Sequence, residues 1–400
     1  MDGPVLPPPT QGSENNACTF VSRQPIYDPS LKIFSYELLN QSENPDLTEL
    51  LSLDPEPFDL EGPAFINVSA DFILNKQLLP LPRDRFVLLM PGDSEPTKLM
   101  LRAILETRDA GCGIGLRNIT SAERSRDLLE RIDYCIVDFS RVTPEQARAQ
   151  TKELKKFGAK LIASQLQSYG DFGKAKEMGF EYFGGPCFLR PRTATPDGIP
   201  PNRIAMMQLI HKLQEPEFDM ADLETIISRD VAISYKLLRY VNSALISLPN
   251  NIESIKHAVQ LVGTQRIRLW TSILIMFGFD DTPSELVVTA FVRATMAEHL
   301  AESMEARSPE SYFTVGLFSV MDAMLDLPMK KAVEMIPLAA SIRDALTDRR
   351  GLIGMALACV LAYEVGDWTK VRCAKLTPEV IRRSYIDSII AARELRKIAV

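Results

Sequence analysis

Residues 20–39 read FVSRQPIYDPSLKIFSYELL and hold two short apolar runs, 20–28 and 32–39, that are typical of β-strands. Similar runs recur up to residue 188 and alternate with segments of helical periodicity. They are AFINVS (64–69), RFVLLM (85–90), GIGL (113–116), YCIVDF (134–139), KLIASQL (160–166) and YFGGPCF (182–188). A repeated strand-then-helix order favours a mainly parallel sheet, for which an α/β barrel is the simplest closure.

The pattern changes after residue 188. Residues 189–202, LRPRTATPDGIPPN, are rich in proline and predict a linker. Nearly every later segment has helical periodicity. Helices are expected at 285–306, 309–326, 351–366 and 378–397, and helix caps at Asp219, Asp230, Ser254 and Thr264. We therefore predict a flexible tail (1–18), a barrel-like domain (19–188), the linker (189–202) and an all-helical domain (203–400).

Composition excludes several classes of protein. Lys and Arg number 45 against 52 Asp and Glu, a net charge of −7, so we expect no broad basic face and no nucleic-acid partner. The six cysteines include no CxxC pair and predict reduced core thiols. No signal sequence or apolar run of membrane-spanning length is present, which predicts a cytoplasmic protein without membrane insertion.

The segments RQPIYD (23–28), YELL (36–39) and FINVS (65–69), in this order, resemble the EAL family of cyclic di-GMP phosphodiesterases. The resemblance implies a (β/α)8 barrel in which the EAL glutamate, an asparagine and later carboxylates hold two divalent cations. Such cations would activate water against a phosphodiester. The short connections on either side of FINVS predict a barrel trimmed of one or more helices.

Several family positions have changed. Glu37, Asn67 and Asp138 match the family, whereas Leu89 stands at a metal-binding glutamate. The other changes are Gln41 for a phosphate-holding arginine, Arg117 and Asn118 for paired aspartates, Ile136 for the lysine, Ser164 and Gln167 for two glutamates, and Gly184-Gly185 for a QG pair. We therefore expect no cofactor, no metal, no catalytic residue and no phosphodiesterase activity. The remnant ligand-binding residues would be Gln24, Pro25, Glu37, Asn67, Arg117 and Asp138.

The run at 227–270, from ISRDVAISYKLLRYVNSA to GTQRIRLW, resembles the HDOD family, a helical relative of HD-type metal phosphohydrolases. In HD enzymes a His-Asp pair holds metal, and Ser319-Val320 stand there in this chain. We expect Asn242, as a buried side chain, to tie down a neighbouring loop, and Gly263 to end a helix. The three histidines, His211, His257 and His299, are predicted to be structural or surface residues rather than metal ligands.

Together the two halves resemble the EAL-HDOD family of bacterial signal-transduction proteins. The first hypothesis is a non-catalytic cytosolic adaptor that contacts regulatory signalling proteins, with inter-domain geometry as its switch. The second is a cyclic di-GMP receptor that binds without hydrolysis, and the third is residual phosphodiesterase activity. A homodimer is left open.

Overall fold

The computed structural model describes residues 20–41, 62–75, 84–119, 121–192, 201–215, 227, 231–242, 252, 254–277 and 284–399. The predicted tail, the caps at Asp219 and Asp230, and residues 193–200 of the predicted linker lie outside these ranges. The predicted domain limits therefore stay a prediction.

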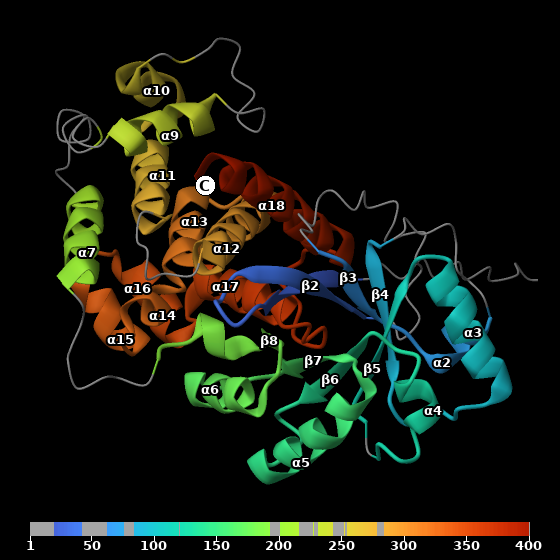
Figure 1. Ribbon diagram of the computed structural model, residues 1–400. Coiled ribbons are helices and arrows are strands. Elements are labelled where there is room, and N and C mark those ends of the chain that lie inside the picture. Colours follow the sequence, from blue (N-terminus) through green and yellow to red (C-terminus); the bar gives the residue numbers. More distant parts are fainter. Residues whose placement is uncertain are drawn as a thin grey trace, which may run out of the picture.

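Eight strands form a closed barrel in sequence order (Figure 1). They are β1 (Val21–Tyr27), β2 (Ile33–Asn40), β3 (Ala64–Asn67), β4 (Phe86–Pro91), β5 (Gly113–Arg117), β6 (Tyr134–Asp138), β7 (Lys160–Ser164) and β8 (Tyr182–Gly184). β1 is antiparallel to both of its neighbours, β2 and β8, and all other neighbouring strands are parallel. The predicted α/β barrel is confirmed, and each predicted strand segment contains one strand.

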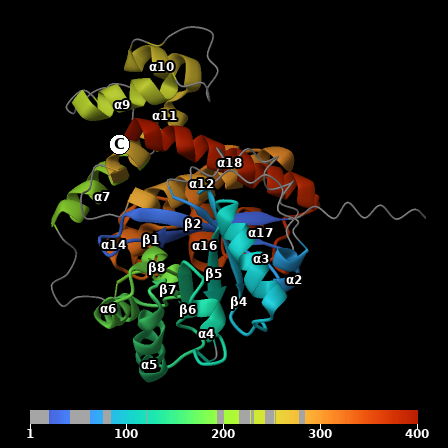
Figure 2. The ribbon, with the colours of Figure 1, turned by 45° about the vertical axis from the view of Figure 1, so that its right-hand side comes forward.

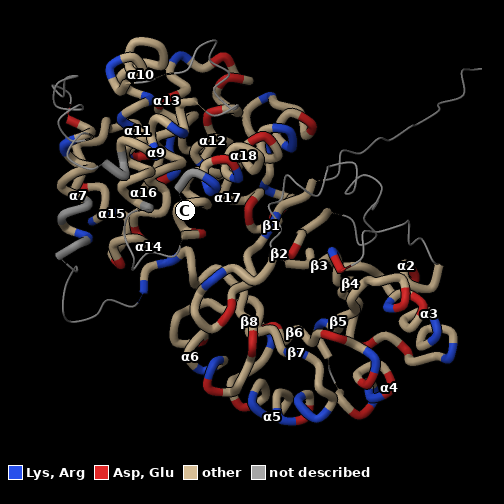
Figure 3. Tube along the Cα trace, turned by 45° about the horizontal axis from the view of Figure 1, so that its top comes forward, with Lys and Arg blue, Asp and Glu red and all other residues tan. Residues whose placement is uncertain are grey.

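Short helices surround the barrel, and many of their residues are charged (Figure 3). They are α2 (Ala70–Leu74), α3 (Lys98–Asp109), α4 (Arg126–Leu129), α5 (Pro144–Leu154), η2 (Lys155–Phe157), α6 (Tyr169–Met178) and η3 (Pro186–Leu189). The connection between β3 and β4 contains α2, a helix of five residues. Residues 76–83 of this connection and residues 42–61 of the one before β3 lie outside the described ranges, so the expected trimming stays a prediction.

The barrel interior is apolar over most of its length. Alternate strand positions point inward. The inward cluster consists of Ile26, Phe65, Val87, Leu89, Ile136 and Ile162. A second apolar layer lies between the outer face of the strands and the helices. Polar inward side chains are therefore concentrated at the end of the barrel where the parallel strands finish.

The second half of the described chain is helical, as predicted. Its elements are α7 (Pro201–Gln214), α9 (Val231–Val241), α10 (Ile255–Val262), α11 (Thr264–Phe277), α12 (Ser284–Ser303), α13 (Pro309–Phe318), α14 (Met321–Leu325), α15 (Met329–Ala332), η4 (Val333–Met335), α16 (Ala340–Asp348), α17 (Gly351–Glu364) and α18 (Pro378–Ala399). α12 packs closely against α13, where a Cβ on Gly316 would lie 2.5 Å from the Ala294 backbone.

Some local predictions hold and others need correction. The Ser254 hydroxyl caps α10 by accepting a hydrogen bond from the His257 N–H at 3.2 Å. Thr264, expected as a cap, is the first residue of α11, because Gly263 already ends α10 with a φ of 92°. The helix expected over 309–326 is interrupted at Ser319-Val320, and α15 and α16 were not predicted.

Asn242 has the expected hydrogen-bonding role. Its side chain donates to the Ile252 carbonyl at 2.8 Å and accepts from the Ile252 N–H at 2.7 Å. The residue is exposed, so the expectation that it is buried was wrong. The apolar run that starts at Trp270 is buried through Met276, as predicted.

The outer face of β1 and β2 packs against the helical half, and Figures 1 and 2 both show the two strands beside α12 and α17. The Tyr36 hydroxyl donates a hydrogen bond to the Glu285 carboxylate at 2.9 Å. The Arg23 guanidinium lies 4.3 Å from the Tyr36 ring centroid and 4.0 Å from Glu285. The Tyr385 hydroxyl accepts from the Arg23 N–H at 3.0 Å.

Phe20, just before β1, extends this contact. Its ring packs against Tyr363 and Trp368 of the helical half, with centroids 5.4 and 5.6 Å apart. The residue belongs to the apolar core of the helical half rather than to either barrel layer. The residue that precedes the first barrel strand is therefore packed in the core of the helical half.

Replacing Tyr36 with Phe tests this interface. The change removes one hydrogen bond to a buried carboxylate while keeping the ring, so we expect the free energy of unfolding to fall by about 1–3 kcal/mol. Tyr182→Phe, inside the barrel next to Phe34, is the matched control, with an expected change near zero. Urea unfolding of both variants measures the difference, and equal stabilities would refute the role of this contact.

Candidate functional site

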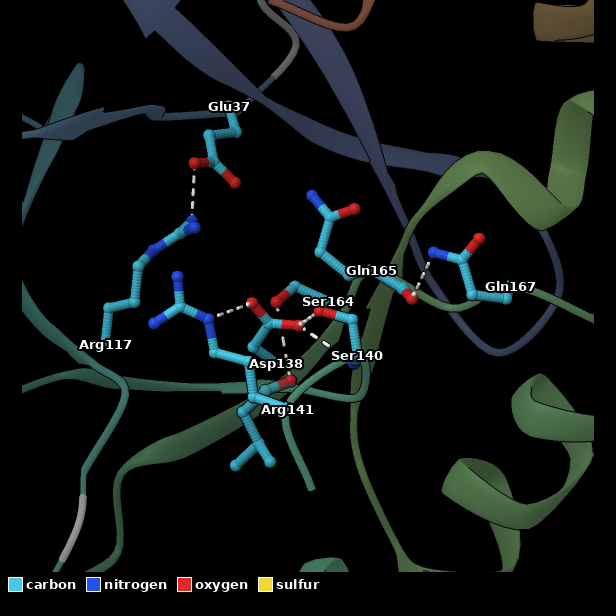
Figure 4. Close-up of polar contacts among 9 residues, drawn as sticks. Glu37, Arg117, Asp138, Ser140, Arg141, Ser164, Gln165 and Gln167 are labelled. Atoms are coloured by element: carbon cyan, nitrogen blue, oxygen red, sulfur yellow. Dashed lines mark hydrogen bonds and ion pairs between the residues drawn. The ribbon is translucent and has the colours of Figure 1, made fainter. Parts of the chain in front are cut away.

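The carboxyl ends of parallel strands meet at one end of the barrel, called here the barrel mouth. The inward polar side chains at the mouth are Glu37, Asn67, Arg117, Asp138 and Ser164, from β2, β3, β5, β6 and β7 (Figure 4 labels all but Asn67). The structure therefore brings four of the six predicted ligand-binding residues to one place. The other two, Gln24 and Pro25, lie on β1, and Gln24 is paired in register with Glu37.

Glu37 is held by two neighbours. The Arg117 guanidinium donates to its Oε1 at 2.5 Å, and the Asn67 amide donates to the same oxygen at 2.8 Å. The Glu37 side chain is 9% exposed and that of Arg117 is 20% exposed. A charge-assisted hydrogen bond at this burial is stronger than a neutral one, so Arg117 neutralises the Glu37 carboxylate.

Asp138 is engaged locally. Its carboxylate accepts from the Ser140 N–H at 2.9 Å and from the Ser140 hydroxyl at 2.6 Å, and Arg141 lies 3.3 Å away. The Ser164 hydroxyl donates to the Val137 carbonyl at 3.4 Å. These contacts fix the turn after β6 (Figure 4).

The remaining changed positions form the wall and rim of the mouth. Leu89 and Ile136 belong to the apolar interior, as expected of alkyl side chains. Gln167 donates to the Gln165 carbonyl at 3.0 Å on the rim. Gly185 has a φ of 146°, and a Cβ there would overlap the Leu166 backbone, so this rim position requires glycine.

A two-metal centre does not fit this arrangement. Two adjacent dications need several hard oxygen ligands. Within the ranges that the structure describes, no three His, Cys, Asp or Glu side chains gather closely enough to hold a metal ion. The Arg117 guanidinium lies where a cation would have to approach Glu37, so no metal-assisted step follows from these residues.

A cavity of about 650 Å³ lies beside the mouth, between the barrel and the helical half. We call it the inter-domain cavity. Gln24, Pro25, Gln165 and Gly185 line it from the barrel. The helical side is lined by α12, α14, α17 and α18 and by the end of α16, including Arg293, Asp322, Arg349 and Glu364.

The helical wall of the cavity contains a second arginine–glutamate pair. Arg293 donates to both Glu364 oxygens, at 2.7 and 2.8 Å, and to the Ser319 hydroxyl at 3.1 Å. Ser319 is the position at which the sequence resemblance predicted the loss of a metal-binding histidine, and the Arg293 guanidinium lies against it. Burial raises the pKa of Asp322 on the same wall.

Sequence reasoning missed Arg293, Glu285 and Glu364. A usable signal was present, because Glu285 and Arg293 stand in the strongly apolar segment SELVVTAFVRATMA (284–297). Charged side chains are seldom fully buried without a partner, so both residues predict buried ion pairs. The partner of each could not be read from the sequence.

The histidines lie where structural roles were expected. His211 is exposed, with its Nδ1 2.8 Å from the Met335 carbonyl oxygen, and His257 is half-buried in the first turn of α10. His299 is half-buried, with its Nδ1 3.5 Å from the Ser384 carbonyl oxygen.

The helical half matches the HDOD domain model over residues 199–337. The chain therefore has the predicted two-part architecture of a closed eight-stranded barrel followed by a helical half that matches the HDOD domain model. Cyclic di-GMP phosphodiesterase CdgJ of Vibrio cholerae is 26% identical over 394 residues, covering 92% of this chain and 91% of that protein. Uncharacterized protein YuxH of Bacillus subtilis is 24% identical over 402 residues, covering 94% and 97%.

Solved structures of EAL domains also match. The FimX EAL domain of Pseudomonas aeruginosa bound to c-di-GMP has 15% identity and a TM-score of 0.36, covering 44% of this chain and 91% of that chain. The Bacillus subtilis YkuI protein, in complex with c-di-GMP and calcium, has 18% identity and a TM-score of 0.36, covering 61% and 73%.

The prediction that the protein is not an enzyme is contradicted by these comparisons and was wrong as made. CdgJ, which aligns with 92% of the chain, is named for phosphodiesterase activity. The prediction was made by counting the family positions that have changed, and such a count ignores how the remaining polar residues are arranged together. Glu37, Asn67 and Asp138 still share one mouth, and Arg117 pairs with Glu37 through a flexible stem. An identity of 26% does not show that this chain has the same activity, so hydrolysis of cyclic di-GMP has to be measured.

Among the described helices, none is both long and apolar enough to cross a membrane.

Replacing Arg117 with Gln tests the electrostatic role of this residue at the mouth. Removing the guanidinium leaves the Glu37 carboxylate unneutralised, so we expect Mn²⁺ at millimolar concentration to raise the unfolding temperature by about 2 °C or more. Arg108→Gln is the matched control, because Arg108 pairs with Asp133 at the other end of the barrel. Thermal unfolding with and without Mn²⁺ measures the effect. An equal response of the two variants and the unchanged protein would contradict this role.

Proposed function

We propose that this protein is a cyclic di-GMP signalling protein that binds the nucleotide at the barrel mouth and in the inter-domain cavity. The observation that carries the proposal is the cavity itself. It is lined by Gln24 and Pro25, of the RQPIYD segment, and by Gly185, which follows β8, and Gln24 is paired in register with Glu37, the partner of Arg117. The name of CdgJ as a cyclic di-GMP phosphodiesterase supports the same ligand.

The size and chemistry of the cavity suit such a ligand. Its volume of about 650 Å³ lies within the usual range of small-molecule sites. A phosphodiester oxygen would compete with Glu37 for the Arg117 guanidinium, because Arg binds phosphate and carboxylate in the same geometry. The amides of Gln24, Gln165 and Gln167 offer donors and acceptors to the edges of guanine bases.

The second part of the proposal concerns the proteins on which this chain acts. We infer that the protein acts on regulatory signalling proteins in the cytoplasm through contacts of its helical half. Tyr235 on α9 and Leu261 on α10 are 64% and 48% exposed, at the end of the molecule far from the barrel (Figures 1 and 2). The five described cysteines are free and buried, as suits a reducing compartment.

Calorimetric titration of the purified chain with cyclic di-GMP in Mg²⁺ tests the ligand. We expect saturable binding that Gln24→Ala weakens roughly tenfold, because a hydrogen-bonding side chain on the cavity wall is lost. Ser94→Ala, in the exposed loop after β4, is the control and should bind as the unchanged chain does. The nucleotide recovered after each titration is separated to detect the linear dinucleotide.

The outcomes separate the alternatives. Saturable binding with intact nucleotide supports a receptor, and accumulation of the linear product supports a phosphodiesterase. An absence of binding by the unchanged chain overturns the proposed ligand.

A further inference from the structure

The arginines around the inter-domain cavity fall into two groups. Four arginines and three carboxylates line it, from both halves of the chain. Arg23 and Arg293 are buried and lie against carboxylates, Glu285 at 4.0 Å and Glu364 at 2.7 Å. Their positive charges are therefore already compensated inside the protein.

The other two arginines have different partners. Arg190, which follows η3 on the barrel side, donates to the Gln167 side-chain oxygen at 3.0 Å. Arg349, which ends α16 on the helical side, donates to the carbonyls of Ala345, at 3.0 Å, and Leu346. Both residues are exposed, and within the described parts of the chain neither lies within ion-pair distance of a carboxylate. Among the described residues, the cavity therefore has on each side one arginine that makes no ion pair with a carboxylate.

The third carboxylate of the cavity is Asp322, on the same wall as Arg349. Its Oδ1 accepts a hydrogen bond from the Ala323 N–H at 2.9 Å, and no ion pair holds it among the described residues. Burial is the main cause that raises its pKa, and burial together with the nearby Arg293 lowers the pKa of Arg349. Burial is the largest cause of both shifts, and the nearby Arg293 opposes the rise in the Asp322 pKa and adds to the fall in the Arg349 pKa.

We propose that Arg190 and Arg349 bind the two phosphodiesters of one cyclic dinucleotide from opposite sides of the inter-domain cavity, so that the HDOD half supplies part of the nucleotide site. The inference rests on the proposed function and adds a binding residue outside the barrel. A cyclic dinucleotide fits because it is a compact dianion, and each guanidinium can bind one phosphodiester. Such a ligand would bridge the two halves of the protein.

Arg349→Gly is the decisive variant. Arg349 has a φ of 58°, which glycine adopts without strain, so the change removes the charge without a backbone cost. We expect the affinity for cyclic di-GMP, measured by calorimetry, to fall roughly tenfold, and Arg190→Ala to have a similar effect. Asp322→Asn removes the opposing charge and should raise the affinity severalfold. Arg343→Ala, elsewhere on α16, is the control with an expected change under about twofold.

A second readout separates binding from folding. Arg349→Lys keeps a cation and should lose less affinity than Arg349→Gly, and the unfolding temperature of each free variant shows whether it is folded. Binding by the unchanged chain that is equally strong in folded Arg349→Gly overturns the HDOD contribution and leaves the proposed function standing. Absence of binding by the unchanged chain overturns the proposed function itself.

Discussion

The alternation of side chains along β2 is the constraint on which the rest of the structure depends. Glu37 points into the barrel and meets Arg117, while its neighbour Tyr36 points outward and donates to Glu285 of the helical half. Because successive strand residues face opposite sides, one strand carries a ligand-site residue and an interface residue at adjacent positions. A shift of one residue in the pairing of β1 with β2 would exchange the two faces and lose both contacts.

Each half of the molecule contains a buried or half-buried arginine–glutamate pair beside the inter-domain region. Arg117 pairs with Glu37 in the barrel, and Arg293 pairs with Glu364 beside Ser319 in the helical half. A guanidinium satisfies a buried carboxylate with directed hydrogen bonds, as a metal would with its charge. Removing one partner of such a pair leaves an uncompensated buried charge, so each pair constrains the packing around it.

The strands, the main helices, the cap at Ser254 and the hydrogen bonds of Asn242 were predictable, because each depends on residues close in the sequence. The barrel mouth was predictable from the resemblance, since strand order fixes which residues meet there. Two contacts join residues far apart in the sequence: the Arg293–Glu364 pair spans 71 positions and the Tyr36–Glu285 contact spans 249. The spacing of apolar residues along the chain does not indicate which distant residues come together. Activity was not predictable from changed ligands, because turnover depends on the whole arrangement and not on single positions.

The position of Phe20 has a consequence for how the two halves can be separated. Its ring is part of the apolar core of the helical half, although the residue immediately precedes β1 of the barrel. A cut in the proline-rich segment would leave the helical half without Phe20 and would expose the outer faces of β1 and β2. The helical half that the proline-rich segment delimits therefore lacks part of its own apolar core. A transplanted helical half would have to bring the first two strands of the barrel with it.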